Sequence, residues 1–451
     1  MKSVYLLLSI MLLISIKANA DCSGVPANNY KTDLSWGESY YQTHLLMEFE
    51  RTRDSELLRT FLRRADCVLA TRDDNSNRDT RSPTWTAYDI YDESRKISNV
   101  GLDGLILFPF GRFLMIYKTE PHLFVDGVAS NLNLDNYKIK FENAISAVSG
   151  YHQTYSWNRS LGTYKAHSLF FEQDSRGRTL KNFERLPYNL VAAMGSAHFM
   201  LYLSNEDPAQ LRIAKFIASD ILNALEYDSL GAVSWLYFYA DKEIPEDLSH
   251  GAIVANFIKL LADSGVIFDA SHIQALDKAI RYFTLGSSDV IYHYIGKNRE
   301  VYYRKYECQQ NSTKNASDIC RSLARWLPVI PYSNWTDLAK EFIPSTNLGN
   351  GGFDYLVRSY VSTFTRELDY GNSTCSREGQ CTSGSCFGLP QTGQMCGFKL
   401  GNYSNCKKDS DCFSGQCFGG QVCGSPLGNG SICTRHHECA SGNCDQSVCV
   451  P

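Results

Sequence analysis

The side chains best suited to proton transfer lie between residues 235 and 251 of this 451-residue chain. The segment Trp235-Leu236-Tyr237-Phe238-Tyr239 alternates aromatic side chains along an extended strand, which predicts that Trp235, Tyr237 and Tyr239 share one side. Flat rings on one side stack on sugars, and a phenol can donate a proton. The strip is therefore a candidate sugar-binding wall with a candidate acid.

A carboxylate-histidine segment follows within ten residues. Asp241 comes first, and Glu246-Asp247-Leu248-Ser249-His250-Gly251 then leads into a predicted helix with His250 in its first turn. An imidazole accepts a proton near neutral pH, which makes His250 a candidate base. Its helical face also carries Val254 and Phe257, so a half-buried core histidine is an equal alternative.

A third candidate is Asn189, in the segment Leu186-Pro187-Tyr188-Asn189 that opens a predicted helix running to about Ser204. A side-chain amide there lies near the unsatisfied N–H groups of the first turn and can hold an anionic group. The alternative is that Asn189 only caps the helix.

These segments together resemble the (α/α)-toroid polysaccharide lyases that cleave uronic-acid polymers, over roughly residues 80 to 340. The resemblance rests on 186–189, 235–239 and 246–251. It implies that Asn189 neutralises the substrate carboxylate, that His250 removes the proton on carbon 5, and that Tyr239, or Tyr237 in its place, protonates the leaving oxygen. Many of these enzymes have a histidine directly after the asparagine, where this chain has Leu190. The chemistry is consistent, because the proton beside a carboxylate is acidic only once that charge is neutralised.

The remaining expectations for the site concern binding groups. We expect Trp235, Tyr237, Glu246, Asp247 and Arg185 to contact an acidic polysaccharide; other basic candidates in or near long loops are Arg159, Lys165, Arg299 and Arg304. Asp241, Glu246, Asp247 and His250 offer cation ligands, but no metalloenzyme motif such as H-E-x-x-H accompanies them. No Gly-rich phosphate fingerprint is present either. We expect neither metal nor cofactor.

Three rival functions stay open. A hydrolase on the same fold would use two carboxylates from Glu184, Asp241, Glu246 and Asp247. A uronate carbon-5 epimerase would begin with the same proton abstraction as a lyase. A non-catalytic carbohydrate-binding or adhesion protein would keep the cleft without the chemistry.

Other histidines and tyrosines are given structural roles. His152, His167 and His198 are expected to pack. The stretches 292–294 and 302–304 are expected to pair as a hairpin around a Gly-Lys-Asn turn, which either lines the cleft or lies at the surface.

Helical periodicity predicts the elements that must position these side chains. Apolar residues recur at three- and four-residue steps from about residue 35 to 367. Short turns alternate with long loops, notably 71–99, 157–185 and 227–248. We therefore expect a mainly α protein, a toroid or incomplete barrel of helical hairpins over 21–370, with its long loops on one face.

The cysteines divide the chain. Of sixteen, only Cys22, Cys67, Cys308 and Cys320 precede residue 375. Cys308 and Cys320 are expected to pair around a sequon-bearing loop, which leaves Cys22 with Cys67. The other twelve follow C-x5-C-x4-C-x(4–9)-C three times within 375–451, each with an S-G-x-C fragment. This tail resembles the cysteine-rich repeats of Dickkopf-type modules, which implies disulfide-held units and no particular ligand. We expect the tail to act as a spacer or to anchor the protein to its polymer; a tail that binds another extracellular protein is the alternative.

Composition and the N-terminus set the compartment and exclude several classes. Residues 1–20 read as a signal peptide, ending in Ala18-Asn19-Ala20, and seven Asn-x-Ser/Thr sequons fit a secreted glycoprotein. After it we expect no membrane span. Lys and Arg total 44 against 48 Asp and Glu, so no nucleic-acid footprint is present. A hydrophobic content of 43% supports a large core.

Overall fold

The computed structural model describes most of the helical part of the chain and short strands of the tail. The described residues are 22–26, 33–76, 82–88, 96–124, 132–165, 185–237, 245–281, 285–287, 290–295, 301–310, 320–329, 342 and 352–365, then 374–375, 386–387, 394–396, 417–418, 422–423, 444–445 and 448–449. The predicted signal peptide and all seven sequons except Asn158 lie outside them.

The described part is mainly helical, which confirms the predicted fold class. Its helices are α2 (Ser39–Thr52), α3 (Ser55–Ala70), α4 (Val100–Thr119), α5 (Leu134–Tyr155), α6 (Tyr188–Asn205), α7 (Pro208–Ala224), α8 (Leu248–Asp263), α9 (Ala270–Ala279), α10 (Lys305–Gln310) and α13 (Gly352–Thr365), with the π-helical turn η1 (Asp33–Glu38) and the 3-10 turns η2 (Pro121–Phe124) and η5 (Ala324–Trp326). Side chains that accept backbone N–H groups start several of them, as Asn99 does for α4 and Asp207 for α7.

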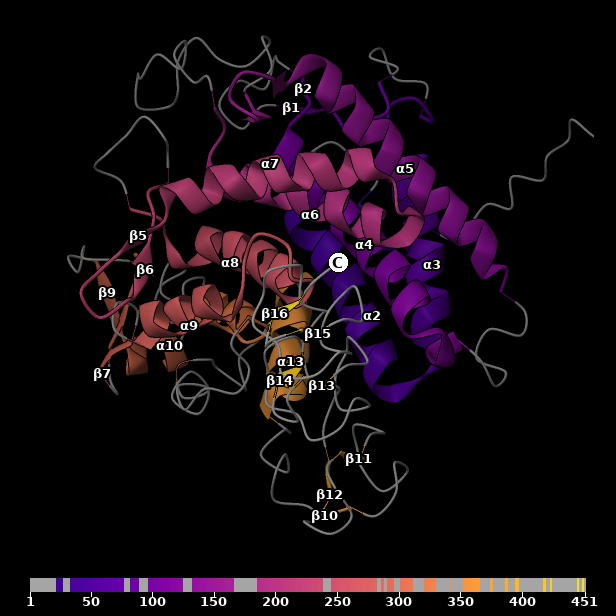
Figure 1. Cartoon of the computed structure of the whole chain (residues 1–451). Coiled ribbons are helices and arrows are strands. Elements are labelled where there is room, and N and C mark those ends of the chain that lie inside the picture. Colours follow the sequence, from indigo (N-terminus) through magenta and orange to yellow (C-terminus); the bar gives the residue numbers. More distant parts are fainter. Residues whose placement is uncertain are drawn as a thin grey trace, which may run out of the picture.

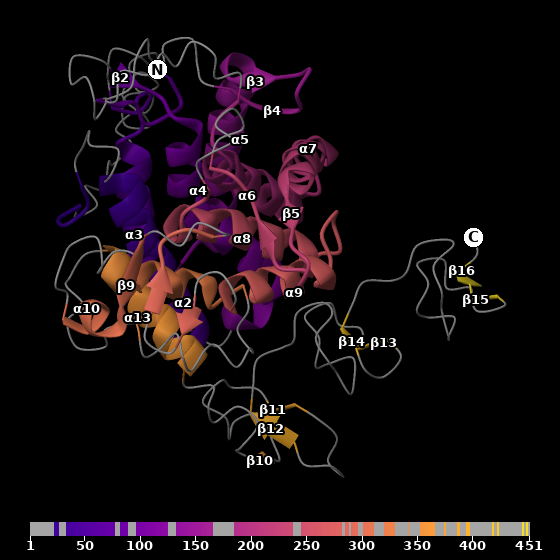
Figure 2. The ribbon, with the colours of Figure 1, turned by 90° about the vertical axis from the view of Figure 1, so that its left-hand side faces the viewer.

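These helices form a ring with a second layer outside it. Each element contacts the next around the ring: α2 with α4, α4 with α6, α6 with α8, α8 with η5, η5 with α13, and α13 with α2. The helices α3, α5, α7 and α9 pack on the outside of α2, α4, α6 and α8 (Figures 1 and 2). Each inner helix is thus paired with the outer helix that follows it, which is the toroid of helical hairpins expected from the periodicity.

The inner helices α4 and α6 are parallel and very close. A Cβ added to Gly104 would lie 2.5 Å from the backbone nitrogen of Met194, and one added to Gly111 would lie 2.7 Å from the Met200 side chain. The two contacts are seven and six residues apart on their helices and advance in the same direction. Glycines on this face of α4 therefore let the backbones approach where any side chain would hold them apart.

The link lengths bring the long connections to one end of the ring. The links from inner to outer helix are short at 53–54, 206–207 and 264–269, whereas 71–99, 156–187 and 225–247 lead from outer to inner helices. Because each short link reverses direction, the long connections gather beside the N-termini of α4, α6 and α8. We call this end the mouth.

Short antiparallel strands stiffen the mouth connections. They are β1 (Ala87–Tyr88) with β2 (Lys96–Ile97), β3 (Trp157–Asn158) with β4 (Thr163–Tyr164), β5 (Glu226–Tyr227) with β6 (Val233–Ser234), and the sheet β7 (Leu285–Ser287), β8 (Val290–Tyr292) and β9 (Tyr302–Arg304). Strands β5, β6, β7 and β9 lie together at the left in Figure 1. Tyr292 opposes Tyr302, so the predicted 292–294/302–304 hairpin is confirmed.

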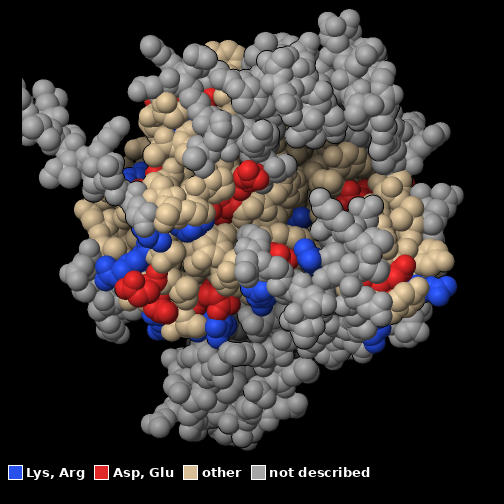
Figure 3. Space-filling view, turned by 180° about the vertical axis from the view of Figure 1, so that it is seen from behind, with Lys and Arg blue, Asp and Glu red and all other residues tan. Residues whose placement is uncertain are grey.

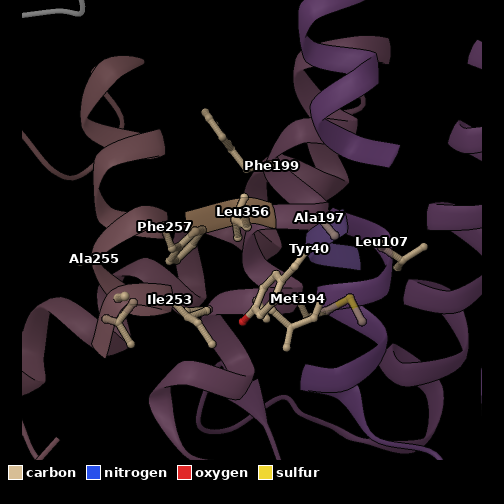
Figure 4. Packing of buried hydrophobic residues seen from close by; sticks show 14 of the residues in the cluster. Tyr40, Leu107, Met194, Ala197, Phe199, Ile253, Ala255, Phe257 and Leu356 are labelled. Atoms are coloured by element: carbon tan, nitrogen blue, oxygen red, sulfur yellow. The ribbon is translucent and has the colours of Figure 1, made fainter. Parts of the chain in front are cut away.

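The core fills the ring and the space between its layers. Tyr40 of α2, Met194 of α6, Ile253 of α8 and Leu356 of α13 belong to one buried cluster (Figure 4). Between the layers, Phe110 of α4 stacks on Phe141 of α5 with ring centroids 4.7 Å apart. Rings of this size contribute most of the burial that fixes an outer helix to its inner partner.

Two disulfides lie in the described helical part. They join Cys22 to Cys67 and Cys308 to Cys320, the two expected pairs, and no described cysteine is free. Disulfides of this kind persist in oxidising, extracellular-type compartments.

The tail repeats one hairpin. Its strands are β10 (Thr374–Cys375), β11 (Cys386–Phe387) and β12 (Gln394–Cys396), then β13 (Cys417–Phe418) with β14 (Val422–Cys423), and β15 (Cys444–Asp445) with β16 (Val448–Cys449). In every unit the third cysteine opposes the fourth across the strands: 386 with 396, 417 with 423, and 444 with 449. The sequence repeat is therefore also a backbone repeat.

Hydropathy and charge add two points. Among the described helices, only α4 is long and apolar enough to cross a membrane, and 72% of its most apolar window is buried inside the protein, as in a core helix. On the face in Figure 3, blue and red side chains are interspersed rather than gathered into one basic surface.

Candidate functional site

The N-terminus of α8 holds His250 in a defined orientation. Asp247 is the N-cap, and its Oδ1 accepts the backbone N–H groups of Ser249 at 2.8 Å and His250 at 2.9 Å. Its Oδ2 lies 2.5 Å from His250 Nδ1. Because a carboxylate only accepts, Nδ1 carries the proton in this contact and Nε2 of the neutral ring is left as an acceptor. The His250 side chain is 33% exposed.

Asp247 is kept ionised by its neighbour. Burial raises the pKa of its carboxyl, but the hydrogen bond and the charge of His250 outweigh burial, and the pKa is lowered. An ionised Asp247 stabilises the imidazolium that forms when His250 takes a proton. The pair has the electrostatics of a general base with its orienting carboxylate.

Glu246 is in a different state. It is fully buried, and its carboxyl accepts the Trp235 indole N–H at 3.2 Å and the Asp247 backbone N–H at 3.1 Å. Burial first, and then the charge of Asp247, raise its pKa well above the usual range. Trp235 is only 2% exposed. The two side chains are hydrogen-bonded to each other inside the core, and their expected contact with substrate stays a prediction.

Two aromatic rings flank His250. The Tyr237 ring centroid lies 5.3 Å away and that of Trp36, from η1, lies 6.0 Å away. The expectation for Tyr237 fits this position. Trp36 was missed, since it lies more than two hundred residues from His250 and only closure of the ring brings it across the mouth.

Arg325 of η5 was also missed. Its Nη1 donates to the Ser249 carbonyl at 2.9 Å, and its guanidinium carbon lies 5.2 Å from the Tyr40 ring centroid and 5.8 Å from that of Trp36. A cation therefore lies one residue from His250. A lone arginine in a loop-rich stretch gives no sequence signal of this placement.

Asn189 is the second residue of α6 and does not cap it. Pro187 is the N-cap, and the Asn189 side chain is 1% exposed with no hydrogen-bond partner for its oxygen or nitrogen among the described residues. A Cβ added to Gly195 of α6 would contact the Phe257 side chain of α8. Gly195 follows Asn189 by six residues, and Phe257 follows Gly251 by six residues. On these neighbouring parallel helices Asn189 is therefore level with the start of α8. An unsatisfied buried amide at this level is consistent with a ligand-facing role.

Several other expected residues fall elsewhere. Tyr239, Asp241, Glu184 and Arg299 lie outside the described residues. Arg185 is half-buried and pairs with Asp220 of α7 at 2.9 Å, which gives it a structural partner.

The packing prediction holds for two of three histidines. His152 Nε2 lies 2.7 Å from Asp103, and His198 lies between the Tyr164 hydroxyl and Gln210. Both imidazoles are buried. His167 lies outside the described residues.

His293 of the extension of β8 adjoins the site. Its carbonyl accepts the N–H of Leu248 at 2.9 Å, which fastens this strand to the start of α8. Burial lowers the pKa of His293, although the charge of Asp247 opposes the shift. A neutral imidazole therefore lines the site beside Asp247.

Glu246, Asp247 and His250 could also hold a cation, since one ligand atom of each lies within 4.8 Å of the others. These groups already have hydrogen-bond partners: Glu246 accepts from Trp235, and Asp247 accepts from the first turn of α8 and from His250.

Comparison with known proteins gives remote structural likenesses. No protein-family profile matches the sequence, and neither does any curated protein. Among solved structures, a D-mannose isomerase shows 10% identity and a TM-score of 0.44, covering 73% of this chain and 87% of its own. A family 88 glycosyl hydrolase from Bacteroides vulgatus shows 15% identity and a TM-score of 0.35, covering 63% of this chain and 88% of its own. A polysaccharide lyase shows 10% identity and a TM-score of 0.35, covering 76% of this chain and 92% of its own. The chemistry of this chain is therefore inferred from its own residues.

Proposed function

We propose that this protein is a secreted polysaccharide lyase that cleaves a uronic-acid-containing polymer by β-elimination at the mouth of the ring. The observation that carries the proposal is the oriented His250, whose Nδ1 is bound by Asp247 and whose imidazole ring lies 5.3 Å from the Tyr237 ring and 6.0 Å from the Trp36 ring. An oriented base between two aromatic walls suits the removal of a proton from a bound sugar.

Each step of the elimination has a candidate group. The Asn189 amide would neutralise the uronate carboxylate, for which its unpartnered oxygen and nitrogen are a supporting observation. Nε2 of His250 would take the proton from carbon 5, and the C–O bond to the leaving sugar would then break as the double bond forms. Tyr239 would give its proton to the departing oxygen, with Tyr237 as the alternative donor.

The hydrolase alternative has one feature in its favour and two against it. The pKa values of Glu246 and Asp247 are pushed apart, as in an acid and base pair. Glu246, however, is fully buried against Trp235, and Asp247 is occupied by three donors of α8. Neither carboxyl is placed to reach a glycosidic bond.

The remaining proposals concern the rest of the chain. A signal peptide at 1–20 and glycosylation at sequons would accompany secretion, and residues 21–370 would form the catalytic domain. The repeats at 375–451 would anchor the enzyme to polymer or to an extracellular protein, raising its effective concentration at the substrate.

The test is a panel of alginate, glucuronan, pectate, heparan and chondroitin, followed by ultraviolet absorbance of the 4,5-unsaturated uronyl product. We expect absorbance to rise on one polymer and to be lost in Tyr239→Phe and Asn189→Ala. New reducing ends without absorbance would identify a hydrolase instead. A change of uronate configuration without cleavage would identify an epimerase, and binding without any reaction a carbohydrate-binding protein.

A further inference from the structure

Arg325 is a buried cation without a carboxylate partner in the described part of the chain. It is 5% exposed, and its hydrogen bonds go to neutral acceptors, the carbonyl and hydroxyl oxygens of Ser249 at 2.9 and 3.3 Å. The neighbouring Arg321 is held by Asp354 at 3.1 Å, and Arg112 by Glu50 at 2.8 Å. A buried charge with no opposite charge beside it is costly unless a ligand supplies one.

Arg325 is anchored to α8 through both its side chain and its backbone. Nη1 donates to Ser249 in the first turn of α8, and the Arg325 backbone carbonyl accepts the Asn256 amide at 3.0 Å about two helical turns further on. Both anchors belong to the helix that carries His250. The position of the cation relative to that imidazole is therefore set by the rigid start of α8.

The surroundings of Arg325 suit a flat, charged group of a sugar. The Trp36 ring is close to both Arg325 and His250, 5.8 Å from the guanidinium carbon and 6.0 Å from the imidazole centroid. The Tyr40 ring centroid lies 5.2 Å from the guanidinium carbon, and Arg325 also donates a hydrogen bond to the buried Tyr40 hydroxyl. A carboxylate in this position would satisfy the unused donors of the arginine fork.

We propose that Arg325 binds the carboxylate of a second uronate residue, next to the one that reacts, whose sugar ring lies against Trp36. This assignment rests on the proposed function and deepens it. It makes the negative charge of the substrate a requirement for binding, so neutral sugars of the same shape are excluded.

Direct binding to the full-length secreted protein tests the assignment without turnover. We would titrate D-glucuronate, D-galacturonate, D-mannuronate and L-iduronate by calorimetry, with D-glucose as the neutral counterpart. At least one uronate should bind, and glucose should not. Arg325→Met should weaken that uronate by about 10- to 100-fold, as expected for the loss of hydrogen bonds to a charged group, and Arg325→Lys should weaken it less.

Two controls separate binding from folding and from catalysis. Arg321→Lys alters a paired arginine four residues earlier and should leave uronate affinity unchanged, while circular dichroism checks that each variant is folded. His250→Gln should bind the uronate with near wild-type affinity.

The assignment is overturned if no uronate binds, if glucose binds equally well, or if folded Arg325→Lys and Arg325→Met keep wild-type affinity. Uronate binding that depends on Arg325 in a protein that cleaves no polymer would uphold this site and defeat the lyase proposal. Polymer cleavage that is unchanged in the Arg325 variants would support the lyase proposal and overturn this binding site.

Discussion

Substituting Gly104 by alanine should disturb the mouth by separating two inner helices. The new methyl would lie 2.5 Å from the Met194 nitrogen and 2.7 Å from the Ala193 carbonyl carbon. Both are backbone atoms of α6, so no side-chain rotation can relieve the contact. The helices must move apart, and with them the N-termini that carry Asn189 and the α4 cap.

The magnitude follows from two opposing effects. Replacing a glycine inside a helix by alanine gains roughly 0.5–1 kcal/mol, and overpacking a well-filled contact costs typically about 1–3 kcal/mol or more. With two backbone atoms well inside contact distance, overpacking should dominate, and the free energy of unfolding should fall by about 2 kcal/mol. Gly150 is the matched control, since it lies within α5 and a Cβ there meets nothing within 4 Å. Gly150→Ala should raise the free energy of unfolding by up to about 1 kcal/mol.

Urea unfolding followed by far-ultraviolet circular dichroism measures both variants against wild type, with the slopes compared to check that the unfolding transition is unchanged. Opposite signs for the same substitution are the expected result. Equal stabilisation by Gly104→Ala and Gly150→Ala would refute the close, parallel packing of α4 on α6.

Two further predictions concern the site and the core. Asp247→Asn should keep the helix cap, because asparagine caps as well as aspartate, but its amide nitrogen would face His250 Nδ1 and disfavour the reactive tautomer. Turnover should fall by about 10²- to 10⁴-fold, while the unfolding free energy should change by less than about 1 kcal/mol. Undiminished turnover would remove His250 as the base. Burial, partly opposed by the Gln210 bond, lowers the pKa of His198 from 6.5 to about 4, so between those values the unfolded chain binds the proton that the folded protein excludes, and stability falls as pH falls. His198 should therefore cost about 2 kcal/mol between pH 7 and pH 5, and urea midpoints at the two pH values should show a smaller loss in His198→Gln; an equal loss would contradict a neutral buried imidazole.

Local patterns in the sequence were sufficient for the helices and for much of the site. Apolar periodicity predicted the hairpins and placed His250 in the first turn of a helix. That turn is the start of α8, with Asp247 as its N-cap. Asn189 was correctly placed at the start of α6, although Pro187 takes the cap position.

The parts that failed depend on contacts between distant segments. Alternation in 235–239 predicted an exposed Trp235, but the Glu246 carboxyl, eleven residues later, takes its indole N–H inside the core. Trp36 and Arg325 reach His250 only because the ring closes through α13 and α2. No local pattern in a single sequence specifies that closure.

The central claim is that His250 is the base of an elimination at the mouth, and one comparison tests it most directly. His272 is a matched control, because Asp269 caps α9 as Asp247 caps α8 and its Oδ1 lies 2.7 Å from His272 Nδ1, but there Nδ1 also accepts the Asp269 backbone N–H at 3.2 Å. On the polymer that the wild-type enzyme cleaves, His250→Gln should lose the rise in unsaturated uronyl absorbance while His272→Gln keeps it. If both variants keep the rise in absorbance, or both lose it while remaining folded, His250 has no catalytic role that His272 lacks, and the claim is contradicted.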